Sequence, residues 1–448
     1  MITLNCCQID LLKLFHGGFS TGHGFLREPN SIRSYASLAC IAIQSNQNDM
    51  FGGQSINAFD YAMAEGVKKS FKKIIAAEVS RACEFCEITP AAEVNFSVCT
   101  YSEKENPAAV ENLTAVVGTK KLAEKIYRQA CRDVEEETHQ AMEALIHNFN
   151  TLHSRAGAQV PFSSINYGMD TSPEGRLATN EVLNAIQAGL GNGETPIFPI
   201  SVFQLKAGVN YNPEDPNYDL FRLAMEVSAK RLFPNFSFLD APYNMAYYKP
   251  GRPETEVAVM GCRTRVLGNI YDKTKQISPG RGNLSFTSLN LPRLGIEAHG
   301  SVSNFYDSLD KMTELIFEQL MDRYELISRK HVYNYPFLMG QGIWLDSGRL
   351  DPDSCIADVI KHGTMSVGFI GLAECLVALT GKHHGESAAA QQLGLEIIGH
   401  LRELTDKRSE STGLNFSLFS TPAEGLSGRF VKKDRNIRRE QDNRTKTN

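Results

Sequence analysis

The chain has 448 residues, a formal net charge of −5, 42% hydrophobic residues and ten cysteines. This composition is typical of a folded globular protein and excludes a wholly disordered chain. The mild acidity does not indicate a protein that binds DNA or a membrane surface. The cysteines are too sparse for a disulfide scaffold, and the first residues lack the basic and apolar regions of a secretory signal. We therefore expect reduced thiols and a cytoplasmic location.

The hydrophobic pattern mixes helical spacing with short apolar runs. In chain order it predicts a helix over 133–153, strands over 195–205 and 256–260, a helix over 308–329, a strand over 368–370 and a helix over 386–405. Ser308 or Asp310 is the expected cap of the second helix. Helices that alternate with short strands indicate an α/β fold with a parallel sheet.

The last residues differ in composition from the rest. Segment 431–448 is polar and mostly basic, with Ile437 as its only large apolar residue after Val431. Such a segment buries too little surface to order itself. A basic tail could contact nucleic acid, but its composition favours a solvated end. We therefore predict a folded core over residues 1–430 and a disordered tail over 431–448.

Cys262 follows the strand-like run at 256–260 and is the first candidate for chemistry. Gly261 permits a tight backbone turn beside it. Arg263 and Arg265 supply positive charge, which would favour a thiolate or an anionic substrate. From these residues alone, a reactive cysteine and a buried inert one are equally supported.

Cys6 and Cys7 are adjacent near the start of the chain. Neighbouring side chains on a strand point to opposite faces, so at most one of the two can face a shared site. A buried strand without chemistry is the alternative for both.

Cys83 and Cys86 form the one CxxC pair of the sequence. A structural zinc site of this kind needs a second pair of ligands. The sequence supplies none, so no metal site is predicted.

Several blocks of sequence together resemble one enzyme family. They are CCQIDL, GGFSTGHGFLREPNSIRSYASLACIAIQSNQNDMFGGQSI, SRAGAQVPFSSINYG, VMGCRTRVLGNIYD, RGNLSFTSLNLPRLGIEA, HGTMSVGFIGLAECLVALTGKHHGE and NFSLFSTPAEGLSGRF. From residue 5 to residue 430 they follow the order found in the anaerobic (class III) ribonucleoside-triphosphate reductases. Residues 1–430 therefore resemble the catalytic core of that family.

The resemblance implies the fold of that family, a ten-stranded α/β barrel made of two antiparallel five-stranded halves, as in glycyl radical enzymes. A finger loop inside the barrel presents a cysteine at its tip, and Cys262 matches that position. In the family this cysteine becomes a thiyl radical, which abstracts the 3′ hydrogen of the ribonucleotide. A dry, enclosed site keeps such a radical from being quenched.

The same resemblance implies roles for other residues. Cys6 matches the second active-site cysteine, which donates a proton or hydrogen as the 2′-hydroxyl leaves as water. Asn5 and Asn283 match residues that hold the ribose hydroxyls. Substrate contacts are implied for Met260, Thr264, Thr421 and Glu424.

The family reduces ribonucleoside triphosphates to deoxyribonucleoside triphosphates without oxygen. Formate is the usual reductant, although some members use thiols, and the sequence leaves both open. The resemblance also implies dNTP and ATP effectors, a homodimer, and an iron–sulfur activase that uses S-adenosylmethionine. It implies no direct contact with DNA or a membrane.

Two parts of the family pattern have no match in the sequence. The ATP-sensing cone would precede Asn5, and the radical glycine and the four-cysteine zinc site would follow Arg435. The expected protein is thus a core without these ends, which binds no cofactor itself. Gly268 lies in a segment that superficially resembles the radical motif, but this segment belongs to the loop of Cys262 and lacks the context of the motif.

Three alternatives follow. The chain could be a catalytically silent fragment that binds nucleotides and dimerises, or a split subunit completed in trans by a separate glycyl protein. A more distant alternative is a relative of pyruvate formate-lyase. Those enzymes carry adjacent cysteines at the finger tip, whereas the adjacent pair here is Cys6 and Cys7.

Overall fold

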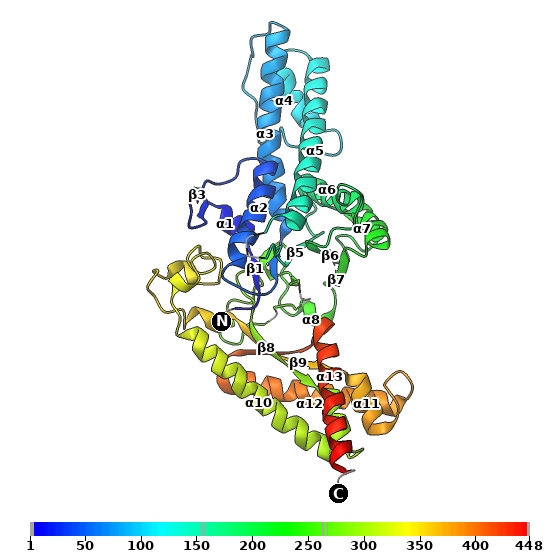
Figure 1. Ribbon diagram of the computed structural model, residues 1–448. Helices are drawn as coiled ribbons and strands as arrows, with labels where there is room; N and C mark the ends of the chain where they lie inside the picture. Colours follow the sequence, from blue (N-terminus) through cyan, green and yellow to red (C-terminus); the bar gives the residue numbers. More distant parts are fainter. Residues whose placement is uncertain (1–3, 154, 156, 262–263, 267, 446–448) are drawn as a thin grey trace.

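The computed structural model describes residues 4–445 except 154, 156, 262–263 and 267, and the side chains of Glu424 and residues 436–445 are outside the described part. Two parallel sheets form its centre (Figure 1). The first has the order β1-β4-β5-β6-β7 and the second the order β10-β9-β8. The strands are β1 Cys7–Ile9, β4 Gln54–Ile56, β5 Ser163–Tyr167, β6 Ile200–Leu205, β7 Asn235–Phe238, β8 Asn283–Asn290, β9 Thr364–Ile370 and β10 Asn415–Ser420. A short antiparallel hairpin joins β2 Phe19–Ser20 and β3 Phe25–Leu26.

Helices pack around both sheets. They are α1 Leu11–Phe15, α2 Ile32–Gln47, α3 Phe59–Phe85, α4 Pro107–Val117, α5 Lys120–Thr151, α6 Pro173–Ala188, α7 Tyr218–Arg231, α8 Pro242–Met245, α9 Leu291–Glu297, α10 Val302–Ser328, α11 Leu372–Thr380, α12 Ala388–Thr412 and α13 Glu424–Thr445. Figure 1 shows α3 and α5 projecting away from the sheets with α4 beside them, while α10, α11, α12 and α13 surround the second sheet. In the described part of the chain, no helix is both long and apolar enough to cross a bilayer.

Strand alternation gives the first sheet two different faces. Ile9, Ile165 and Phe203 belong to the large apolar core that the sheets form with the helices. On β5 and β6, the opposite face carries polar side chains such as Asn166 and Gln204, because successive residues of a strand point to opposite sides. This inner face is where the loop between β7 and β8 lies.

An antiparallel seam joins the two sheets at β1. The Cys6 N–H donates to the Asn283 carbonyl at 3.1 Å, and the Gln8 N–H donates to the Arg281 carbonyl at 2.9 Å. The Gly280 N–H donates to the Gln8 carbonyl at 2.8 Å. Residue numbers that rise along one segment while they fall along the other are the mark of antiparallel pairing. The two halves thus run in opposite directions along this seam.

The expected closed ten-stranded barrel is not confirmed. The first half has five strands, but the second has three among the described residues, and β7 and β10 are both edge strands there. What the structure supports is the α/β class with parallel sheets and one hydrogen-bonded seam.

Most of the predicted elements are present. The helices predicted over 133–153, 308–329 and 386–405 correspond to α5, α10 and α12, and the strands predicted over 195–205 and 368–370 overlap β6 and β9. The cap predicted at Ser308 or Asp310 is wrong. Helix α10 begins at Val302, because the Ser301 side chain accepts a hydrogen bond from the Asn304 N–H.

Helix α13 occupies the tail that composition predicted to be disordered. Its backbone is helical as far as Thr445. Asp434 accepts hydrogen bonds from Arg293 Nε at 2.8 Å and from Asn290 Nδ2 at 3.1 Å. These contacts attach the helix to the junction of β8 and α9, and composition alone contains no information about them.

Candidate active site

The long connection between β7 and β8 contains the loop predicted to present a reactive cysteine. Cys262 lies outside the described residues. Arg263 also lies outside them, but the loop is described on either side of these two residues: Val259 and Arg265 form an antiparallel bridge, and the Met260 N–H donates to the Thr264 carbonyl at 2.8 Å. The two limbs of the loop are therefore paired up to the residues that flank the predicted tip.

We call residues 256–260, which lead up to the loop tip, the ascending limb. Side chains of the first sheet bind the backbone of this limb. Asn166 satisfies both backbone groups of Val259, accepting from its N–H at 2.8 Å and donating to its carbonyl at 3.0 Å. Ser55 donates to the same carbonyl at 3.0 Å, and Gln204 donates to the Val257 carbonyl at 3.0 Å. The strand predicted over this limb is therefore wrong, since side chains and not a sheet ladder satisfy its backbone.

Cys6, directly before β1, and Cys7, its first residue, face opposite sides of the chain, as their adjacency predicts. Cys6 is fully buried in a small cluster with Met260 and Val266, two residues of the loop. Cys7 belongs to the large helix-backed core instead. Burial raises the pKa of the Cys7 thiol far above its usual range, which keeps this thiol protonated. Of the two, Cys6 is thus the one that faces the loop.

Buried amides accompany Cys6 at the seam. Asn5 and Asn283 are 6% and 1% exposed, and the backbone N–H of Asn5 donates to the Asn283 carbonyl at 3.1 Å. The side-chain oxygen of Asn283 has no hydrogen-bond partner in the described part of the protein, and neither amide atom of Gln8 has one. Gln8 lies two residues beyond Cys6, on the same face of the chain. Each such buried group costs roughly 1–3 kcal/mol, which a polar ligand could offset.

Of the other predicted substrate contacts, Thr264 lies on the loop, and Thr421 and Glu424 lie just beyond β10 of the second sheet. Thr421 follows β10, where its hydroxyl shares a 2.7 Å hydrogen bond with Ser288 and its N–H donates to the Phe369 carbonyl at 3.0 Å. Glu424 begins α13, and its side chain is outside the described part. The structure therefore gathers Asn5, Cys6, Asn283 and Met260 around the seam and places Thr421 elsewhere in the second half, beside Ser288 of β8.

No pattern in the sequence predicts the buried acidic group at the base of the loop. Asp60 accepts hydrogen bonds from three successive backbone N–H groups that follow β5, at 2.8 to 2.9 Å. Tyr61 donates to Glu256 at 3.3 Å, where the ascending limb starts. Burial, helped by neighbouring carboxylates, raises the pKa of Glu256 to about 8 and that of Asp60 to about 6. Asp60 and Glu256 are distant in sequence, so no local pattern links them.

We expect Glu256→Gln to change how stability depends on pH. The folded protein keeps the Glu256 proton up to about pH 8, whereas an unfolded chain loses it near the ordinary value of 4.5. Stability contributed by this group therefore falls as the pH rises through that window. Glutamine keeps an acceptor for Tyr61 without this loss, so the variant should melt about 2–4 °C higher at pH 8. Melting curves from pH 5 to pH 8 measure this.

Glu254→Gln is the matched control, because Glu254 is partly exposed beside Arg252. Its variant should melt in parallel with the unmodified protein at every pH. An unchanged pH slope in Glu256→Gln would contradict the assignment.

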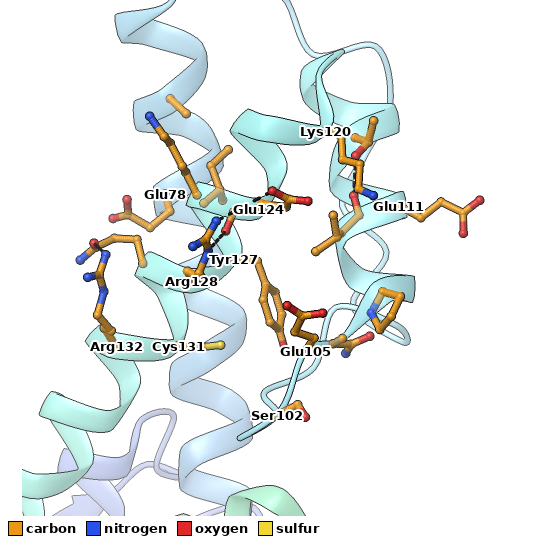
Figure 2. A pocket seen from close by; sticks show the side chains of 18 of the residues that line it. Glu78, Ser102, Glu105, Glu111, Lys120, Glu124, Tyr127, Arg128, Cys131 and Arg132 are labelled. Carbon is orange, nitrogen blue, oxygen red and sulfur yellow. Dashed lines mark hydrogen bonds and ion pairs between the residues drawn. The ribbon is translucent and has the colours of Figure 1, made fainter.

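A large cavity lies away from this loop, in the projecting helices. It has a volume of about 1580 Å³ and lies among α3, α4 and α5 (Figure 2). Glu124, Arg128 and Arg132 are among the charged residues that line it, together with Cys131. Among the described residues, no group of three or more His, Cys, Asp and Glu side chains is placed to hold a metal ion.

Known proteins resemble this chain over nearly its whole length. The family model "Anaerobic ribonucleoside-triphosphate reductase" matches residues 1–446. The enzyme of that name from Escherichia coli is 31% identical over 434 residues, which is 96% of this chain and 54% of the relative. The one from Enterobacteria phage T4 is 30% identical over 438 residues, or 96% of this chain and 63% of the relative. The chain thus spans between half and two thirds of these relatives.

Solved structures agree in fold. An anaerobic ribonucleotide reductase matches with a TM-score of 0.63 at 14% identity, covering 97% of this chain and 59% of that one. The Thermotoga maritima enzyme in complex with dATP and CTP matches with a TM-score of 0.63 at 14% identity, covering 97% and 62%. The resemblance seen in the sequence blocks is therefore confirmed, and this chain belongs to the anaerobic ribonucleoside-triphosphate reductase family.

Proposed function

We propose that this chain is the core of an enzyme that reduces ribonucleoside triphosphates to deoxyribonucleoside triphosphates without oxygen. The observation that carries the proposal is the position of Cys6. It is buried against Met260 and Val266, on the loop that contains Cys262, while Cys7 faces the helices. A site between two cysteines is what thiyl radical chemistry on a ribose requires.

In the proposed reaction, a thiyl radical at Cys262 takes the 3′ hydrogen of the substrate and later returns it. Cys6 supplies a proton or hydrogen as the 2′-hydroxyl leaves as water. Asn5 and Asn283 hold the ribose hydroxyls, and the unpartnered Asn283 oxygen supports this because a hydroxyl could donate to it. Contacts of Met260, Thr264, Thr421 and Glu424 with the nucleotide belong to the same proposal.

Formate is the proposed reductant. It would supply two electrons and leave as carbon dioxide, while the substrate oxygen leaves as water, so the overall reaction balances. A thiol reductant is the alternative. The radical at Cys262 would come from a glycyl radical segment made active by an iron–sulfur activase with S-adenosylmethionine.

Further binding partners are also proposals. One solved neighbour is titled with dATP bound in the specificity site, and another with dATP and CTP. On this basis we infer that nucleoside triphosphates serve this protein both as substrates and as effectors. That the protein acts as a homodimer is a further proposal, which rests on the family resemblance alone. The family's zinc finds no matching group among the described side chains, so no step is assigned to it.

The test is anaerobic incubation of the chain with the activase, S-adenosylmethionine, a reductant, formate and CTP, with and without a supplied glycyl segment. We expect dCTP with the segment only, and none after Cys262→Ala. Cys355→Ala, at an exposed cysteine, is the control and should keep full activity. Product without the segment would contradict the need for it. CTP binding without product under any condition would favour the silent fragment, the second candidate function.

A further inference from the structure

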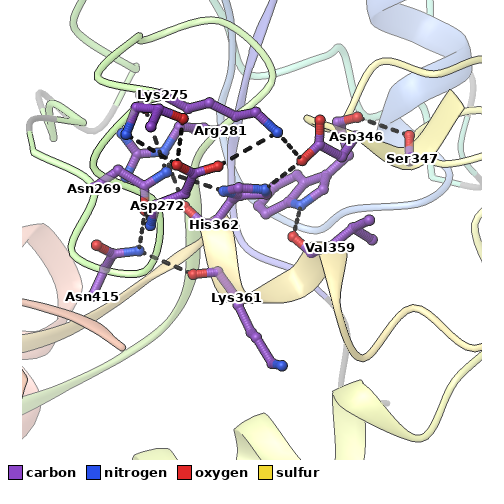
Figure 3. Close-up of polar contacts among 12 residues, drawn as sticks. Asn269, Asp272, Lys275, Arg281, Asp346, Ser347, Val359, Lys361, His362 and Asn415 are labelled. Atoms are coloured by element: carbon purple, nitrogen blue, oxygen red, sulfur yellow. Dashed lines mark hydrogen bonds and ion pairs between the residues drawn. The ribbon is translucent and has the colours of Figure 1, made fainter. Parts of the chain in front are cut away.

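A buried polar network joins the loop to the second half of the fold (Figure 3). We call residues 264–281, which lead from the loop tip to β8, the return limb. This limb has little regular secondary structure, so side chains must hold it in place. Asn269, 1% exposed, is its anchor, and it contacts His362 before β9 and Asn415 at the start of β10.

The hydrogen bonds of His362 define one state of its ring. Nε2 lies 2.8 Å from the Asp346 carboxylate, which can only accept, so Nε2 carries the hydrogen. The side-chain oxygen of Asn269 accepts from the Asp272 N–H and from Asn415 Nδ2, each at 3.3 Å, which leaves the Asn269 nitrogen as a donor. That nitrogen lies 3.0 Å from His362 Nδ1, which must therefore accept. The imidazole is neutral and both of its nitrogens are used.

Charged groups hold this arrangement from two sides. Lys275 Nζ lies 2.6 Å from the Asp346 carboxylate. Arg281, fully buried, donates to the carbonyls of His362 at 3.0 Å and Gly268 at 3.1 Å. The guanidinium thus bridges the return limb and the 3-10 helix Val359–His362. The titratable or charged groups that face the imidazole are Asp346, Lys275, Arg281 and Tyr271.

We propose that His362 is a positioning residue for the loop that carries Cys262. The neutral ring accepts from Asn269 and thereby holds the return limb in place against the second half of the fold. The part that concerns catalysis rests on the proposed function, because the task of the loop is to present Cys262. We call the attachment of the return limb to His362 through Asn269 the clamp. The clamp can be measured without any turnover.

The clamp should weaken in acid. Burial lowers the pKa of His362 below its ordinary value of 6.5; Asp346 opposes this, and Arg281 and Lys275 add to it. Below pH 6.5 an opened limb would bind a proton that the closed limb does not bind, so the closed state loses stability as the pH falls. A proton on Nδ1 would also turn this nitrogen into a donor. It would then face the Asn269 amide, which is a donor as well, and the hydrogen bond between them would be lost.

Two variants test the two hydrogen bonds of the ring separately. His362→Gln can keep a donor for Asp346 but loses the acceptor for Asn269. His362→Asn can place an acceptor where Nδ1 lies, while it loses the contact with Asp346. Trp344→Phe is the matched control, since it removes the 2.8 Å hydrogen bond from Trp344 to the Val359 carbonyl in the same 3-10 helix and alters neither hydrogen-bond partner of the imidazole, Asn269 or Asp346.

The measurement is amide hydrogen exchange of the full chain, read by mass spectrometry at matched pH. At pH 7.5 we expect His362→Gln to raise exchange in 264–281 at least about tenfold, His362→Asn to raise it less, and Trp344→Phe to leave it unchanged. In the unmodified protein, protection of 264–281 relative to α5 should fall from pH 7 to pH 5.5, and this fall should be absent in His362→Asn.

The proposal is overturned if His362→Gln leaves exchange in 264–281 unchanged, or if it raises exchange evenly along the chain. In the complemented enzyme, His362→Gln should lower kcat and leave the KM for CTP unchanged. A clamp seen by exchange in a chain that never forms dCTP would refute the proposed reaction but not the clamp.

Discussion

We expect Gly282→Ala to destabilise the folded protein severely. A Cβ at this position would lie 1.8 Å from the Cys6 carbonyl oxygen, 2.7 Å from its carbon and 2.8 Å from the Cys7 Cα. All three atoms are backbone, so no side-chain rotation can relieve the clash. Either β1 moves away and the seam to β8 breaks, or the chain does not fold. We expect a loss of more than about 4 kcal/mol in the free energy of unfolding, at the extreme of single substitutions.

Thermal melting followed by circular dichroism measures this loss. Gly399→Ala is the matched control, because Gly399 lies exposed within α12 and a Cβ there meets no atom within 4 Å. Alanine is the better helix former, so this variant should gain roughly 0.5–1 kcal/mol. A Gly282→Ala protein that melts together with the unmodified one would show that the seam is placed wrongly.

The second large effect is expected at Cys6. In the complemented assay, Cys6→Ala should reduce formation of deoxynucleotide at least about 10³-fold, or about 4 kcal/mol in the barrier, because the neighbouring thiol, Cys7, faces the helices and cannot replace it. Its melting temperature should change little, since the cluster around it is small.

Cys7→Ala provides the opposite case in the neighbouring position. Cys7 is equally buried but faces the helices, so its truncation should cost stability through a cavity and leave most of the activity. Rates of dCTP formation and melting temperatures, measured for both variants, separate the two cysteines. Greater loss of activity in Cys7→Ala than in Cys6→Ala would show that Cys7, and not Cys6, is the hydrogen donor.

Local regularities explain what could be predicted from the sequence. Helical spacing located α5, α10 and α12, since such spacing reflects the apolar face that each helix buries. Strand alternation separated Cys6 from Cys7, because neighbouring side chains on a strand must point in opposite directions. Motif order identified the family, and through it the loop that contains Cys262. The first two inferences need only residues close together in the chain, and the third needs only short blocks and their order.

What only the tertiary structure decided depends on residues far apart in the chain. Ser55 and Val259, which meet where the first sheet holds the loop, are 204 positions apart, and Asn269 and His362 are 93 positions apart. No periodicity or composition relates such pairs. In the sequence Gly282 is an ordinary loop glycine, and only the structure shows that the backbone of Cys6 and Cys7 leaves no room for a Cβ there. The sequence by itself determined the α/β class, the family and the candidate cysteines; the seam, the support of the loop and the raised pKa of Glu256 arise only when folding brings distant polar groups together out of water.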